Sequence, residues 1–181
     1  MKTRLEVREA GHADAGAIAA LHAASWRATY RGIMPDSFLD GPVESERLRH
    51  WQQALAQPEA GDLVLLAHRG GAPVAFVAVR RDPDGQYDAY LDNLHVRPGL
   101  TGGGIGRRLL GLAARRLARA GRRSLYLWAY DANAGGIAFY ERLGAVVVER
   151  GTERFAGADL PHSRLAWTDT AALADACGVP G

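Results

Sequence analysis

The stretch that decides the fold runs from residue 94 to residue 110 and reads LHVRPGLTGGGIGRRLL. An apolar strand pattern is followed by a proline, a loop dense in glycine and an amphipathic helix with arginines in its first turn. Glycine has no Cβ, so such a loop can take unusual dihedral angles and approach a ligand closely. The free N–H groups and the dipole at a helix start favour negative charge. The stretch therefore predicts a phosphate site.

Two common phosphate-binding motifs do not match this spacing. A P-loop places a lysine directly after its last glycine, and the only lysine of this chain is Lys2. The Rossmann fingerprint Gly-x-Gly-x-x-Gly fails at its third glycine. Counted from Gly102 that position is Arg107, and counted from Gly104 it is Leu109. The phosphate site is therefore of another kind.

The composition indicates one globular domain. The chain has 181 residues, of which 48% are hydrophobic and 23% charged, as in ordinary soluble proteins. Its net charge of +2 is too small to indicate a nucleic-acid or membrane partner. No apolar run approaches the roughly 20 residues of a membrane span, and no signal peptide is visible. With the single cysteine Cys177 excluding an internal disulfide framework, we expect a cytoplasmic protein.

Periodicity predicts an α/β (α+β) protein with a mixed, mostly antiparallel central sheet flanked by helices. Asp14 is placed to cap the first helix. We expect one domain over residues 1–168 and a tail or short helix over 169–181. The predicted strands cover residues 5–9, 63–68, 74–80, 89–96, 125–129, 146–149 and 164–167, and the predicted helices cover 14–27, 44–56, 105–120 and 134–143.

A second stretch, residues 125–145, reads LYLWAYDANAGGIAFYERLGA. Here a strand is followed by Asn133, a helix that carries Phe139 and Tyr140, and a Leu-Gly pair. Together with the loop of residues 101–106 and the Val-x-Pro that precedes it, this stretch resembles the GNAT superfamily of N-acetyltransferases. The resemblance extends over nearly the whole chain, to about Thr168.

The resemblance implies an acetyl-CoA site and the GNAT acyl-CoA N-acyltransferase fold. Thr101 stands where the family has Gln or Arg, which removes a long side chain from the pyrophosphate site. Asn133 would cap its helix and also bind the pantetheine arm, although capping alone explains it. The implied cofactor-binding residues are Leu94, His95, Val96, Thr101, Gly102, Gly103, Gly104, Ile105, Gly106, Arg107, Asn133 and Tyr140.

The implied reaction is direct attack of an amine on the thioester in a ternary complex, without a metal. Tyr140 is the implied donor of a proton to the departing thiolate, with a core aromatic as the alternative. Asp92 and His95 are the candidate bases, and a structural histidine is the alternative for His95. Strict alternation places Asp92, Leu94 and Val96 on one face of their strand. The six histidines show no metal-ligand spacing.

Aromatic residues of the first helices and the late hairpin are candidates for the acceptor pocket. We expect Trp26, Tyr30 and Trp128 to bind the substrate, and Met34, Phe38, Phe155 and His162 are further candidates; simple packing is the alternative. Trp128 occupies the position of a glutamate in relatives that modify protein N-termini. We therefore expect a small-molecule amine, with a protein N-terminus or lysine, or a non-catalytic acyl-CoA sensor, as alternatives. A homodimer stays open.

Overall fold

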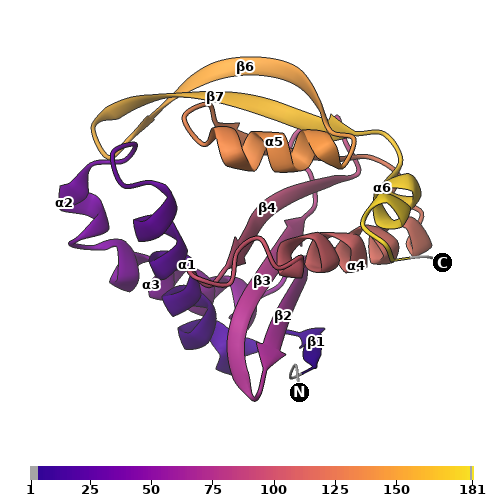
Figure 1. Cartoon of the computed structure of the whole chain (residues 1–181), viewed down its shortest axis with the longest axis horizontal. Helices are drawn as coiled ribbons and strands as arrows, with labels where there is room; N and C mark the ends of the chain where they lie inside the picture. Colours follow the sequence, from indigo (N-terminus) through magenta and orange to yellow (C-terminus); the bar gives the residue numbers. More distant parts are fainter. Residues whose placement is uncertain (1–3, 180) are drawn as a thin grey trace.

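The protein is built on one seven-stranded sheet with the strand order β1-β2-β3-β4-β5-β7-β6 (Figure 1). The computed structural model describes residues 4–179 and 181. Every neighbouring pair of strands is antiparallel except β4 and β5, which run parallel. The mixed, mostly antiparallel sheet predicted from the sequence is thereby confirmed. Its strands are β1 (Leu5–Glu9), β2 (Leu63–Arg69), β3 (Ala72–Arg80), β4 (Ala89–Val96), β5 (Leu125–Tyr130), β6 (Val146–Phe155) and β7 (Ala158–Trp167).

Helices cover both faces of this sheet. On one face, α1 (Ala15–Thr29) and α3 (Val43–Ala56) pack Ile18 and Trp51 against Phe76. On the other face, α4 (Ile105–Arg119), α5 (Ala134–Arg142) and α6 (Thr170–Ala176) share a larger core with β4 and β5. A 3-10 turn (His12–Asp14) precedes α1, and the short α2 (Asp36–Leu39) precedes α3. None of the helices described is long and apolar enough to cross a membrane.

The last two strands are longer than their sequence pattern predicts. The expected strands over residues 146–149 and 164–167 are the ends of a hairpin that pairs Val146 with Ala166 and continues to Phe155 and Ala158. β6 is the outer strand of the sheet and is mostly exposed. Its residues therefore show no apolar alternation, and backbone pairing alone extends the strand.

Asp14 does not cap α1, contrary to the prediction. Its carboxylate accepts the N–H of Gly11 at 2.8 Å and two nitrogens of Arg8 at 2.7 and 2.8 Å, and it makes no side-chain cap on α1. The 3-10 turn before the helix brings the side chain back to Gly11. The hydrogen bonds from Arg8 lower the pKa of Asp14 to about 2.

The C-terminal segment packs on α4. Leu173, Ala174 and Cys177 belong to the same core cluster as Leu110 and Ala114. The two helices approach closely at Gly111, where an added Cβ would lie 2.5 Å from the Cβ of Cys177 and 2.8 Å from a methyl carbon of Val179. The absence of a side chain at Gly111 is therefore what lets the segment lie against α4.

We predict that Gly111→Ala lowers the free energy of unfolding by roughly 1–3 kcal/mol, because the added methyl overpacks this contact. Gly16→Ala is the matched control, since Gly16 is exposed on α1 and an added Cβ there meets nothing within 4 Å. That variant gains up to about 1 kcal/mol from helix propensity. Chemical denaturation measures both, and equal stabilisation of the two variants would contradict the α4–α6 contact.

Candidate functional site

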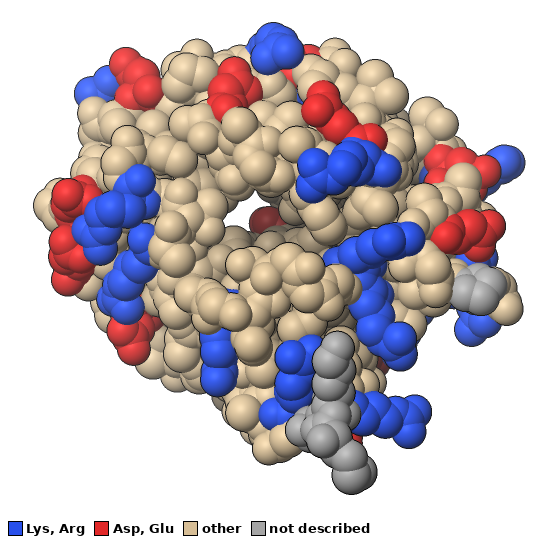
Figure 2. Space-filling view, in the orientation of Figure 1, with Lys and Arg blue, Asp and Glu red and all other residues tan. Residues whose placement is uncertain are grey.

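The centre of the sheet is opened by the divergence of β4 and β5. The two strands pair only where Ala89 meets Leu125 and Tyr90 meets Tyr126. Beyond these positions they separate, and a cavity of about 550 Å³ lies between them, lined from β4, β5, α1, α5 and the loop before α4. Figure 2 shows the molecule hollowed at this place, with an acidic side chain visible at the far side of the opening.

The glycine-rich loop forms one end of the cavity. Gly99, Gly102 and Gly104 have φ values of 85°, 79° and 79°, a backbone region that favours glycine. Gly104 is the N-cap of α4, and the first hydrogen bond within the helix is donated by the N–H of Arg108. The N–H groups of the first turn therefore have no acceptor inside the helix. Every loop residue predicted from Thr101 to Arg107 lines the cavity except Gly103.

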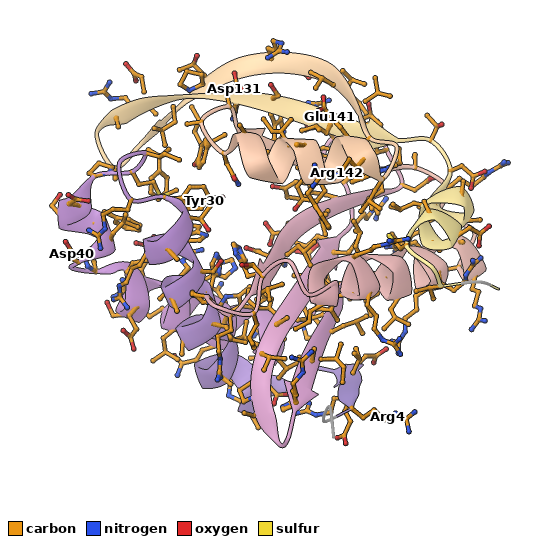
Figure 3. All side chains as sticks on the ribbon, viewed as in Figure 1. Arg4, Tyr30, Asp40, Asp131, Glu141 and Arg142 are labelled. Carbon is orange, nitrogen blue, oxygen red and sulfur yellow. The ribbon has the colours of Figure 1, made fainter. Side chains whose placement is uncertain are left out.

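Two arginines give this end of the cavity its positive charge. Arg107 lines the cavity and donates one hydrogen bond of 2.7 Å to the carbonyl oxygen of Ala176 at the end of α6. Arg142, at the end of α5, also lines the cavity. Tyr30 and Arg142 lie on opposite sides of the opening in Figure 3. The sequence motif does not reveal Arg142, because its proximity to the loop depends on how α5 packs across β4 and β5.

The start of α5 is held as the sequence predicts. Asn133 caps the helix, and its side-chain oxygen accepts the N–H of Gly136 at 3.1 Å. Both residues line the cavity. A Cβ at Gly136 would come within 2.6 Å of the Asn133 amide nitrogen, whereas one at Gly135 would meet nothing within 4 Å. The orientation of the Asn133 amide therefore depends on a glycine at position 136.

The hydroxyl of Tyr140 opens into the cavity. Tyr140 lines the cavity, and its ring packs edge-on against Trp167 with centroids 5.9 Å apart. The hydroxyl makes no hydrogen bond to the described residues. It is not among their fully buried polar atoms that lack a partner, so it is accessible from the cavity. Burial raises the pKa of Tyr140 above its usual value. The phenol is therefore protonated and can donate to a group in the cavity.

The floor of the cavity contains a β-bulge that strict alternation does not anticipate. Asn93 pairs with Ala78, and Leu91 pairs with Val79, so Asp92 is an extra residue between them. Leu91, Leu94 and Val96 consequently pack in the core beneath α4. Asp92 lies on the opposite face, where its carboxylate accepts the Nε–H of Arg80 at 2.8 Å. The predicted placement of Asp92 beside Leu94 and Val96 is therefore wrong.

The two candidate bases have different surroundings. Asp92 lines the cavity but is ion-paired with Arg80. His95 also lines the cavity, and its Nδ1 lies 2.9 Å from the hydroxyl of Ser25 on α1. Burial, with a smaller contribution from the positive charge of Arg47, lowers the pKa of His95 to about 3. His95 is therefore a neutral imidazole near pH 7.

The aromatic candidates fall into two groups. Tyr30 and Trp128 line the cavity, and Trp128 stacks on His162 with ring centroids 4.1 Å apart. Trp26 does not line the cavity but packs edge-on against Tyr30 at 6.0 Å. The further candidates Met34, Phe38 and Phe155 pack in a hydrophobic cluster behind it. Simple packing, the alternative interpretation, describes these three residues.

No three histidine, cysteine, aspartate or glutamate side chains within residues 4–179 are grouped so that they could hold a metal ion. The arrangement instead combines free backbone N–H groups and arginines at one end with a protonated phenol and a neutral imidazole further in. Such a site suits a phosphate-bearing ligand whose other end reaches between β4 and β5.

Comparison with known proteins agrees with this geometry. The model of the Acetyltransferase (GNAT) family matches residues 21–145. The chain is 30% identical over 173 residues to YuaI, an uncharacterized N-acetyltransferase of Bacillus subtilis (strain 168), covering 92% of this chain and 95% of YuaI.

Solved structures share the fold. The PaiA N-acetyltransferase of Thermoplasma acidophilum in complex with coenzyme A superimposes with a TM-score of 0.72 at 21% identity, over 88% of this chain and 98% of that one. YncA, a putative acetyltransferase from Salmonella typhimurium with acetyl-CoA, gives a TM-score of 0.67 at 20% identity, over 92% and 94%. The family match and the relative in Bacillus subtilis show that this chain belongs to the GNAT family of acetyltransferases.

Proposed function

We propose that this protein transfers an acetyl group from acetyl-CoA to a primary amine of a small molecule, by direct attack in a ternary complex. One observation supports this most directly: a single cavity joins the free N–H groups at the start of α4 to the hydroxyl of Tyr140. A cofactor with phosphates at one end and a thioester at the other fits this arrangement.

Acetyl-CoA would lie along the cavity with its pyrophosphate at the loop of residues 101–106. The N–H groups of Ile105, Gly106 and Arg107 would bind the phosphate oxygens, with Arg107 and Arg142 adding positive charge. The backbone of Leu94, His95 and Val96 faces the gap left by β5 and would pair with the pantetheine amides. The coenzyme A and acetyl-CoA complexes of the two structural neighbours support this placement.

The chemistry requires three events at the thioester. The amine nitrogen attacks the carbonyl carbon, the C–S bond breaks, and the departing thiolate takes a proton. Tyr140 is the proposed proton donor, because its hydroxyl is protonated and opens into the cavity. Asp92 and His95 are the candidate acceptors of the proton that the amine loses.

The uncharged side chains of the cavity lining support a small polar acceptor. Ser25, Thr29, Tyr30, Asn93 and Trp128 line the cavity and carry no charge near neutral pH, and the carboxylate of Asp92, also in the lining, is paired with Arg80. We expect a small amine to bind there, with a protein N-terminus or lysine as the alternative. The cytoplasmic location and a homodimer remain predictions.

We predict that Tyr140→Phe lowers kcat by roughly 10²- to 10⁴-fold, the usual contribution of a general acid, and leaves acetyl-CoA binding unchanged. The measurement is release of free thiol from acetyl-CoA with a panel of small amines, together with calorimetric titration of acetyl-CoA. Tyr87→Phe is the matched control, because Tyr87 does not line the cavity.

Each outcome of this experiment is decisive. Loss of turnover in Tyr140→Phe alone supports the proposed proton donor, and full activity in that variant removes Tyr140 from the reaction. If the unaltered protein binds acetyl-CoA and acetylates peptides only, the acceptor is a protein. If it binds acetyl-CoA and acetylates nothing, the non-catalytic sensor replaces the enzyme.

We predict that Gly136→Ala weakens acetyl-CoA binding by roughly 2- to 10-fold, about the contribution of one hydrogen bond, because the new methyl displaces the Asn133 amide. Gly135→Ala is the control in the same helical turn, since an added Cβ there meets nothing within 4 Å. Calorimetric titration of acetyl-CoA compares the two. Equal affinities would show that Asn133 does not contribute to cofactor binding.

A further inference from the structure

The side chain of Tyr30 enters the cavity from the end of α1, on the side of the opening that lies across from Arg142 (Figure 3). Tyr30 is the C-cap of α1, and its N–H donates to the carbonyl oxygen of Trp26 at 2.8 Å. Its own carbonyl oxygen accepts the N–H groups of Ile33 and Met34, each at 2.9 Å. Three backbone hydrogen bonds therefore fix the point from which this side chain leaves the helix.

Two aromatic rings hold the ring of Tyr30 in place. Trp26 packs edge-on against it from α1 with centroids 6.0 Å apart, and Tyr130 packs edge-on from β5 at 5.6 Å. The hydroxyl of Tyr130 donates to a carboxylate oxygen of Glu153 at 3.0 Å, and Tyr130 does not line the cavity. Of these two neighbouring phenols, that of Tyr30 is the one that the cavity can use.

The side chain of Asn133 determines how the Tyr30 hydroxyl is used. The amide oxygen of Asn133 accepts the N–H of Gly136, so the amide nitrogen is left to make the hydrogen bond with Tyr30. An amide nitrogen only donates, and the oxygen of Tyr30 is therefore the acceptor. As a donor, the Tyr30 hydroxyl has no partner among the described residues, and it is not one of their fully buried unpartnered atoms. Its O–H is free to donate to a group in the cavity.

Tyr30 and Tyr140 act on the same part of the cavity. Both line it, and Tyr30 is close enough to add to the effect of burial, which raises the pKa of Tyr140. Burial also raises the pKa of Tyr30, against a smaller effect of the hydrogen bond with Asn133. Both hydroxyls therefore keep their protons near pH 7. Two protonated phenols in one cavity suit a group that becomes negatively charged between them.

Building on the proposed function, we propose that Tyr30 donates a hydrogen bond to the sulfur atom of the cofactor as the thioester is cleaved, with Asn133 as the positioning residue for this donor. The electron pair of the breaking C–S bond goes to sulfur. Sulfur takes the proton of Tyr140, and the proton that the amine loses balances it. Tyr30 keeps its own proton and stabilises the negative charge on sulfur while that charge develops.

The neighbours of Tyr30 favour the sulfur over the carbonyl oxygen of the thioester. Asn133 and Tyr140 are the two residues that the proposed function places beside the pantetheine arm and the departing thiolate. The carbonyl oxygen has other donors within reach, because β4 is unpaired towards β5 beyond Tyr90. Tyr30 is therefore assigned to the leaving group, together with Tyr140.

The direct test is carbon-13 NMR of coenzyme A labelled at the carbon bonded to sulfur, bound to the full chain and titrated from pH 7 to 10. The chemical shift of that carbon reports ionisation of the thiol. A hydrogen bond to the thiolate lowers the pKa of the bound thiol, so Tyr30→Phe should raise this pKa by about 1. Tyr130→Phe is the matched control and should leave it unchanged, since its hydroxyl donates to Glu153. Equal values in Tyr30→Phe and the unaltered protein would overturn the proposal.

Asn133→Ser tests the positioning role in the same titration. Serine keeps the cap of α5 but removes the amide nitrogen that reaches Tyr30. We expect the pKa of the bound thiol to rise, and the double variant with Tyr30→Phe to raise it no further than Tyr30→Phe does alone. An unchanged pKa in Asn133→Ser, or additive rises in the double variant, would show that Asn133 does not act through Tyr30.

Turnover of the best amine in the panel supplies the second arm. Tyr30→Phe should lower kcat by roughly 10- to 100-fold, the contribution of one hydrogen bond to a charged group, while the KM for the amine stays the same. A higher KM at unchanged kcat would place Tyr30 in acceptor binding instead and would overturn its role at the sulfur. Tyr130→Phe should change neither parameter.

The two proposals fail in different ways. If the unaltered protein acetylates an amine and Tyr30→Phe matches it in both thiol pKa and kcat, the role of Tyr30 is wrong while the acetyltransferase function stands. If the unaltered protein binds coenzyme A but acetylates no amine, the proposed function fails, and the thiol titration still decides whether Tyr30 contacts the sulfur.

Discussion

The separation of β4 from β5 is the constraint on which the site depends. Backbone N–H and C=O groups inside a protein are nearly always paired, yet these strands pair at only two positions before they diverge. Each strand keeps a partner on its other edge, β3 for β4 and β7 for β5. The gap can therefore persist without unravelling the sheet. It presents unpaired backbone to any ligand that itself carries amide groups.

The elements around this gap give the two sides of the cavity different charge. The loop after β4 and the end of α5 contribute Arg107 and Arg142. The side nearer α1 contributes Ser25, Thr29 and Tyr30, which are uncharged near neutral pH. The two sides of the cavity therefore differ in polarity, and the proposed acceptor would bind on the uncharged side.

Burial shifts the pKa values of the proposed acid and the candidate base in opposite directions. Desolvation disfavours whichever form of a group is charged. It therefore raises the pKa of Tyr140 and lowers that of His95. Both side chains are neutral near pH 7, the phenol with its proton and the imidazole without a second one. One physical effect thus prepares a proton donor and a proton acceptor in the same cavity.

The sequence by itself determined the features that are set by neighbouring residues. The glycines and the helix start after β4 identify the predicted phosphate-binding loop in the sequence. Asn133 caps α5, as its position before the helix predicts. Features that need distant segments to meet were decided only by the tertiary structure. The bulge at Asp92 changes which side chains share a face, because the pairing of β4 with β3, not local periodicity, sets the register. The contacts of His95 with Ser25 and His22 join residues about 70 positions apart, and side-chain packing alone brings them together.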